Sequence, residues 1–180
     1  DYPYFMYFFA WAYTQENDPI PGEYEGFKGG DAIFMARAKQ LEGPWEIYMG
    51  DDKWDTTMSP KLWVPVIVAT DTPDSNWHVG DPSVVYKDGI FYMAFSGMGT
   101  DLDGIPSHKP GDTDGNTSCI KLATSTDGIH WDISEEPILI WENEIGHDDR
   151  NSSSYYGGYQ RPSLMYDDGF WKCWFDYAAS

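Results

Sequence analysis

The stretch DPSVVYKDGIFYMAFSG (residues 81–97) occurs again 80 residues later as RPSLMYDDGFWKCWFDY (residues 161–177), without a gap. Six positions are identical in the two copies, namely Pro82 and Pro162, Ser83 and Ser163, Tyr86 and Tyr166, Asp88 and Asp168, Gly89 and Gly169, and Phe95 and Phe175. Most other positions exchange one apolar residue for another. A period of this length with strand-forming content predicts a repeat architecture. A sharp chemical difference is at the first position, where Asp81 is replaced by Arg161.

Each copy has the pattern of a β-hairpin. Apolar and aromatic residues lead to an Asp-Gly pair, at residues 88–89 and again at 168–169, and a second aromatic run follows. An Asp-Gly pair between apolar segments is a strong hairpin signal, because type I′ turns require positive φ at both central residues. The sequence therefore predicts two hairpins of the same kind.

A second repeated unit extends each hairpin. Residues 120–133 (IKLATSTDGIHWDI) resemble residues 33–47 (IFMARAKQLEGPWEI), and residues 91–97 resemble residues 4–10 (YFMYFFA). A Pro-led apolar run follows each copy of this unit, at 60–63 and at 137–141. The repeating unit is therefore expected to hold four strands.

Four-stranded units that repeat around an axis are the blades of a β-propeller. The predicted fold is all-β, with a partial blade at 1–70 (strands 2–4), a complete blade at 77–145 and a partial blade at 157–180 (strands 1–2). This amounts to about two to two and a half blades, and a closed propeller needs at least about four. We therefore expect the remainder of the propeller to come from further sequence or from a partner chain.

Composition limits the possible partners. The formal net charge of −19 repels phosphate backbones and argues against nucleic acid. No stretch approaches the roughly 20 apolar residues of a transmembrane helix. Aromatic residues make up 17% of the chain, and Trp and Tyr are residues that stack on sugar faces. These features favour a carbohydrate partner and no membrane span.

The repeated pattern resembles the five-bladed propeller glycosidases of glycoside hydrolase families 43 and 32, over essentially the whole chain. The residues that carry the resemblance are the Asp-Pro-Ser-Val-Val-Tyr-x-Asp-Gly stretch that starts at Asp81 and the Ser-x-Asp-Gly-Ile-x-Trp stretch at 125–131. The resemblance implies hydrolysis of a glycosidic bond in an oligo- or polysaccharide, no required cofactor, and an extracellular or periplasmic location. In these families one Asp from each of the first two blades and a Glu from the third meet in a central pocket.

Asp81 matches the Asp-Pro position of that resemblance. It is therefore the candidate catalytic carboxylate, as the first-blade base or as the second-blade modulator. The alternative is an Asp that bonds local backbone at the entry to a strand. Trp77 and His78, just upstream, are candidates for the pocket rim, and each could equally be structural.

Arg161 departs from the pattern of the resemblance. No carboxylate is present at Gln160 or Arg161, where an acid Glu is expected if Asp81 belongs to the second blade. An Arg in the pocket would suit an anionic glycan, or the phosphate of a phosphorolytic relative, because its planar fork binds such groups bidentately. Alternatively, Arg161 neutralises Asp81 or another acid. Asp176 is a weaker candidate for the pocket, and a non-catalytic glycan-binding or assembly module is the competing function.

The long loop after the second hairpin is rich in Asp and Gly. Closely spaced Asp residues can gather oxygen ligands for Ca²⁺, but the twelve-residue calcium loop with its terminal Glu is missing. The alternatives are a weak calcium site and a solvated acidic loop. The candidate ligands are Asp101, Asp103, Asp112 and Asp114.

Overall fold

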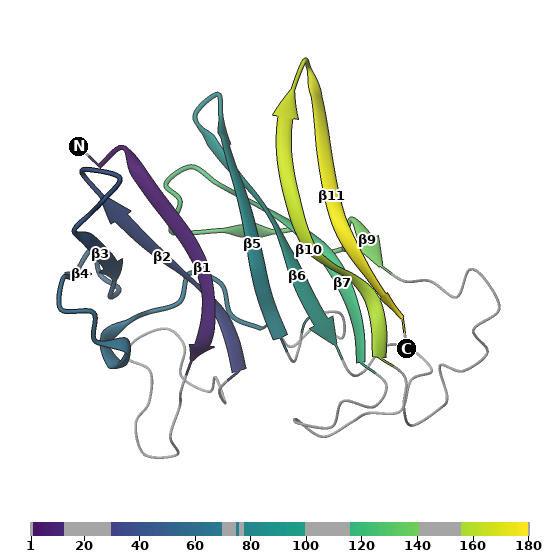
Figure 1. Cartoon of the computed structure of the whole chain (residues 1–180), viewed down its shortest axis with the longest axis horizontal. Coiled ribbons are helices and arrows are strands. Elements are labelled where there is room, and N and C mark those ends of the chain that lie inside the picture. Colours follow the sequence, from purple (N-terminus) through teal and green to yellow (C-terminus); the bar gives the residue numbers. More distant parts are fainter. Residues whose placement is uncertain are drawn as a thin grey trace.

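The structure is a computed structural model that describes residues 2–12, 30–69, 75, 78–99, 116–140 and 156–179. Within these residues the chain forms two sheets and one short 3-10 helix (Figure 1). The first sheet has the order β1 (Tyr4–Ala12), β2 (Gly30–Ala38), β3 (Trp45–Tyr48), β4 (Trp54–Asp55). The second has the order β11 (Phe170–Ala179), β10 (Tyr156–Asp167), β7 (Asn116–Ser125), β6 (Ile90–Gly99), β5 (His78–Lys87). The predicted all-β class is confirmed.

Both predicted hairpins are confirmed. Strands β5 and β6 are joined at Asp88-Gly89, and β10 and β11 are joined at Asp168-Gly169. In both turns the Asp and the Gly have positive φ, with values of 52° and 84° in the first and 50° and 83° in the second. These are the signs of φ that a type I′ turn requires.

The second repeated unit is confirmed by the register of the strands. Ala36 of β2 pairs with Met6 of β1, just as Ala123 of β7 pairs with Met93 of β6. The same two alanines pair on their other side with Ile47 of β3 and with Ile133 of β8 (Asp132–Ile133). Strands β1–β2–β3 and β6–β7–β8 are therefore two copies of one antiparallel unit.

The expected fourth strand is split into short pieces. The Pro-led run at 60–63 forms a 3-10 helix, η1 (Pro60–Leu62). Pro60 has no N–H for a strand ladder, and the backbone N–H groups of Leu62 and Trp63 donate within the turn, to Ser59 and Pro60. The chain returns to the sheet afterwards, where Ile67 forms a bridge with Ile33 of β2. In the other unit β8 and β9 (Leu139–Ile140) both pair with β7, at different points along it. Strand β2 of the first unit and strand β7 of the second thus each pair with two short segments.

The strand pairs β1–β2, β5–β6 and β10–β11 lie side by side in sequence order (Figure 1). Strand β10 also joins β7 through a short parallel ladder at residues 156–158, so the second and third units share one sheet. Gly158 permits this contact, because its φ is 133° and a Cβ atom would lie 2.2 Å from the carbonyl oxygen of Ser118. The propeller itself stays a prediction.

The hydrophobic core lies between the first sheet and strands β5, β6 and β7. Its buried members from β2 and β6 include Ile33, Met35, Met93 and Phe95, each at most 1% exposed. Trp131 occupies the position that Trp45 holds in the other copy of the unit. Its ring packs edge-on against Tyr7 of β1 and against Phe91. The core therefore joins the first unit to the second and holds β5 in place.

Asp55 organises the loop that contains η1. Its carboxylate accepts hydrogen bonds from Thr57, from the backbone N–H of Ser59 at 2.8 Å and from the Trp63 indole at 3.3 Å. The hydrogen bond from the Thr57 hydroxyl, helped by the others, lowers the pKa of Asp55 to about 2.

We expect Asp55 to make the folded state sensitive to acid. Because its pKa is lowered on folding, the stabilisation is present above the ordinary pKa of 3.8 and is lost as the pH falls towards about 2. Asp55→Asn should lower the melting temperature at pH 7 and reduce its dependence on pH between these two values. Asp52→Asn, an exposed position in the preceding turn, is the matched control. Equal pH profiles for the two variants would contradict this role.

Candidate functional site

The two repeated Pro-Ser steps each contain a β-bulge. The pairing of β5 with β6 shifts between Gly80 and Ser83, and that of β10 with β11 shifts between Gln160 and Ser163. Asp81 and Arg161 lie in these bulges, and both have φ of 50°. A left-handed conformation at a residue other than glycine costs of order 1–3 kcal/mol and is concentrated at functional sites. Bulges also redirect side chains, so the repeat places Asp81 and Arg161 in a special backbone conformation.

The two bulges meet at Ser96. Gly80, next to Asp81, is the cross-strand partner of Ser96. The buried Ser96 hydroxyl in turn accepts a hydrogen bond of 2.8 Å from the backbone N–H of Arg161. A second bond of 2.8 Å runs from the backbone N–H of Leu164 to the Ser83 hydroxyl. The first strand of the third unit is therefore fixed to the second unit on both sides of the bulge.

The side chain of Asp81 is half-buried. Within the described part of the chain, no hydrogen bond or ion pair involves its carboxylate. The His78 ring lies over the neighbouring Gly80 and packs edge-on against Phe9 of β1, with 6.1 Å between the ring centroids. The place of His78 at a pocket rim stays a prediction. Trp77 lies outside the described residues.

Arg161 pairs with Asp176 and not with Asp81. Its Nη1 atom lies 3.3 Å from Oδ2 of Asp176 on β11. Both side chains are about two thirds exposed, at 67% and 64%, and exposed pairs of this kind contribute little to stability. The guanidinium therefore stays accessible to solvent, and Asp176 is its partner on β11.

Gln160 lies in the interior. It is 7% exposed, and its amide donates a hydrogen bond of 2.9 Å to the hydroxyl of Ser118 on β7. This bond supports the strand that carries Arg161. The geometry gives Gln160 a supporting position behind the site and no open side towards a ligand.

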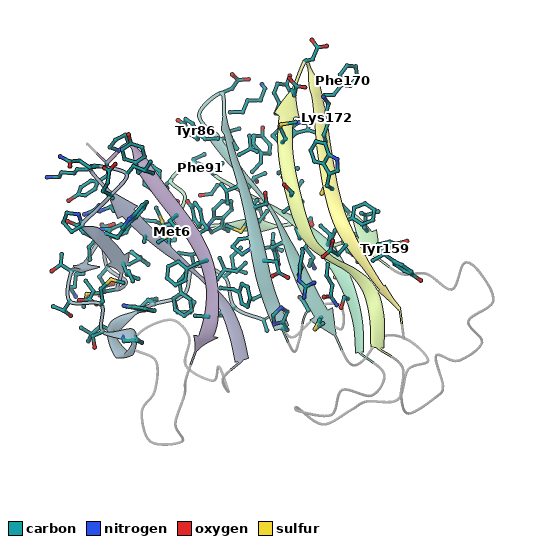
Figure 2. All side chains as sticks on the ribbon, viewed as in Figure 1. Met6, Tyr86, Phe91, Tyr159, Phe170 and Lys172 are labelled. Carbon is teal, nitrogen blue, oxygen red and sulfur yellow. The ribbon has the colours of Figure 1, made fainter. Side chains whose placement is uncertain are left out.

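Three aromatic residues at the ends of β10 and β11 form a cluster that was not predicted. The ring of Tyr159 lies 5.2 Å from that of Phe175 and 5.6 Å from that of Tyr177. Phe175 and Tyr177 are 41% and 52% exposed. Tyr159 lies towards the end of β10 away from the Phe170 turn (Figure 2). Phe175 and Tyr177 stand two positions apart in β11, which places their two rings on one face of the strand and Asp176 on the other.

Comparison with protein-family models and with curated proteins finds no match for this chain. No helix in the described ranges is long and apolar enough to cross a membrane. The acidic residues at 101–114 proposed for calcium lie outside the described residues, and elsewhere no cluster of three His, Cys, Asp or Glu side chains occurs among the described ones. The function must therefore be argued from the site around Asp81 and Arg161.

Proposed function

We propose that this chain forms part of a carbohydrate-processing site of the glycosidase-like propeller type. The observation that carries the proposal is the pair of left-handed bulges, which bring Asp81 and Arg161 to one place at Ser96. Strain repeated at equivalent positions, with a carboxylate in one copy and a guanidinium in the other, supports a ligand-binding role better than a role in folding.

Asp81 supplies the carboxylate of this proposed chemistry. Cleavage of a glycosidic bond requires a protonated acid at the leaving oxygen and an ionised carboxylate on the other side of the sugar. Within the described residues Asp81 has no partner that would occupy its oxygens, so it can act as a base, a nucleophile or a modulator. The second carboxylate is supplied by Asp176 or by a neighbouring unit.

Arg161 selects an anionic group on the sugar, such as a carboxylate or a sulfate. Its guanidinium is exposed, and its contact to Asp176 through Nη1 leaves other N–H groups available. The exposed rings of Phe175 and Tyr177 flank Asp176 in β11, so strand alternation places them on the other face of the strand from the Arg161–Asp176 pair.

We expect Arg161→Met to weaken binding of a uronic acid or sulfated glycan by about tenfold to a hundredfold, in the range of a charge-assisted hydrogen bond. Binding should be measured by calorimetry against neutral and anionic glycans at two salt concentrations. Lys172→Met is the matched control, because Lys172 lies near the opposite end of β11 (Figure 2). If both variants lose the same affinity, Arg161 acts only through net charge.

A non-catalytic glycan-binding module is the second candidate. The observation that favours it is the guanidinium at the position where an acid is expected, together with its ion pair to Asp176. Release of reducing ends from the glycan that binds best distinguishes the two functions. Binding without release supports the binding module, and release that depends on Asp81 supports hydrolysis.

A further inference from the structure

Aromatic rings gather at the turn end of the hairpins, away from Asp81. Tyr86 and Phe91 lie near the turn that joins β5 to β6 (Figure 2). The Phe91 ring lies 4.5 Å from that of Tyr86 and packs edge-on against Phe5 of β1, with 5.8 Å between the ring centroids. Three rings therefore meet where the first unit contacts the second.

The same arrangement recurs where the second unit contacts the third. The Trp171 ring lies 4.5 Å from that of Tyr92 and 5.0 Å from that of Tyr166. The alignment of the repeats makes these three rings the counterparts of the first three. Lys87, the residue after Tyr86, places its Nζ atom 4.6 Å from the centroid of the Tyr166 ring. We call these rings the tip band, which consists of Phe5, Tyr86, Phe91, Tyr92, Tyr166 and Trp171.

Several rings of the tip band are exposed. Tyr86 is 63% exposed, although Phe91 beside it is 9% exposed. Tyr166 and Trp171 are 36% and 44% exposed. Contiguous exposed apolar surface marks binding sites, whereas single exposed side chains need no explanation. The tyrosine is identical in the two copies of the repeat, at an exposed strand position where a β-branched residue would serve the hairpin as well.

The charges beside the tip band are paired within the chain. Lys87 forms an ion pair with Asp88, and Lys172 forms one with Asp167. A charged partner gains little from groups that are already neutralised, and the net charge of −19 disfavours contact with a second copy of the chain. Ammonium N–H groups and carboxylate oxygens beside exposed rings suit a neutral ligand that carries hydroxyl groups.

We propose that the tip band binds a neutral polysaccharide whose sugar rings stack on Tyr86 and Tyr166. A sugar ring has an apolar C–H face and a hydroxylated edge, which match an aromatic face flanked by polar groups. A polymer fits because the arrangement of rings repeats from one contact between units to the next. Tyr86 lies roughly 15 Å along β5 from Asp81, at the rise of a β-strand. The tip band is therefore separate from the site around Asp81 and does not rest on the proposed function.

Affinity electrophoresis tests this proposal in native gels that contain arabinan, xylan, galactan or mixed-linkage β-glucan. At least one of these neutral polysaccharides should slow the chain, and Tyr86→Leu and Tyr166→Leu should each weaken that binding by about tenfold. Tyr86→Phe keeps the ring and should bind within about twofold of the unchanged protein. Phe170→Leu is the matched control. Phe170 is 68% exposed at the same end of the hairpin (Figure 2), but strand alternation places its ring on the other face of β11 from Trp171.

The proposal fails if no gel slows the chain, if both Tyr→Leu variants bind fully, or if Phe170→Leu loses as much affinity as they do. Melting temperatures within about 2 °C of the unchanged protein show that a loss of binding is local, and losses that follow the melting temperature instead contradict the proposal. If Arg161→Met abolishes binding and Tyr86→Leu does not, the polysaccharide binds at the candidate site, so the tip band is wrong while the proposed function stands. If Tyr86→Leu converts a dimer into a monomer by light scattering, a second copy occupies the tip band and the proposal fails.

Discussion

Replacement of Asp81 by Asn is expected to reduce glycan cleavage by at least about 100-fold, the contribution of a single acid–base group, and to leave the fold intact. Asn has the size of Asp and tolerates the left-handed conformation that position 81 requires, with φ of 50°. No described residue depends on the Asp81 carboxylate for a hydrogen bond or an ion pair. The change therefore removes a charge from the site without removing a contact from the scaffold.

The measurement pairs the initial rate of reducing-end release with a thermal melt of the same sample. Asp168→Asn is the matched control, because Asp168 also has φ of 50° but lies in the exposed turn of β10–β11. Its rate and its melting temperature should both stay near those of the unchanged protein. If Asp81→Asn cleaves at the full rate, Asp81 is not catalytic. A large fall in its melting temperature would show that the carboxylate has a structural role.

The hairpins could be predicted because their signals are local. Asp-Gly pairs determine the two turns through their positive φ, and the alternation of apolar residues determines which face of each strand is buried. The structure adds the register, in which Met6 pairs with Ala36 just as Met93 pairs with Ala123. The division of the fourth strand into short pieces could not be predicted from the repeat, because Pro60 and the hydrogen bonds to Asp55 compete with strand pairing at this place.

The bulges at Asp81 and Arg161 had a local signal that the sequence interpretation did not use. Proline has no N–H to donate, so within a sheet it is confined to edges, strand starts and bulges. The repeated Pro82 and Pro162 each follow the left-handed residue. The hydrogen-bond and ion-pair partners of Arg161 could not be predicted. The ion pair of Arg161 with Asp176 and the bond from its backbone to Ser96 depend on how two strand pairs pack together.

The largest expected effect on stability is that of Phe95→Ala, which should lower the free energy of unfolding by about 3–5 kcal/mol, as found for large-to-small changes in cores. Phe95 is 1% exposed and packs in the cluster that joins the first sheet to β5 and β6. Its counterpart in the repeat provides the control, because Phe175 is the same residue at the same strand position but is 41% exposed. Phe175→Ala should cost about 1 kcal/mol or less.

Urea denaturation of both variants measures the difference, with the slope of the transition compared as well as its midpoint. The contrast tests the arrangement of the repeats and not only the burial of one ring. If Phe95→Ala lowers the free energy of unfolding by no more than Phe175→Ala does, the first sheet does not pack on β6. The first and second units then do not share a core. If Phe175→Ala instead has the larger effect, the face of the β10–β11 hairpin that carries Phe175 is covered in solution. Light scattering on the same samples then shows whether a second copy of the chain covers it.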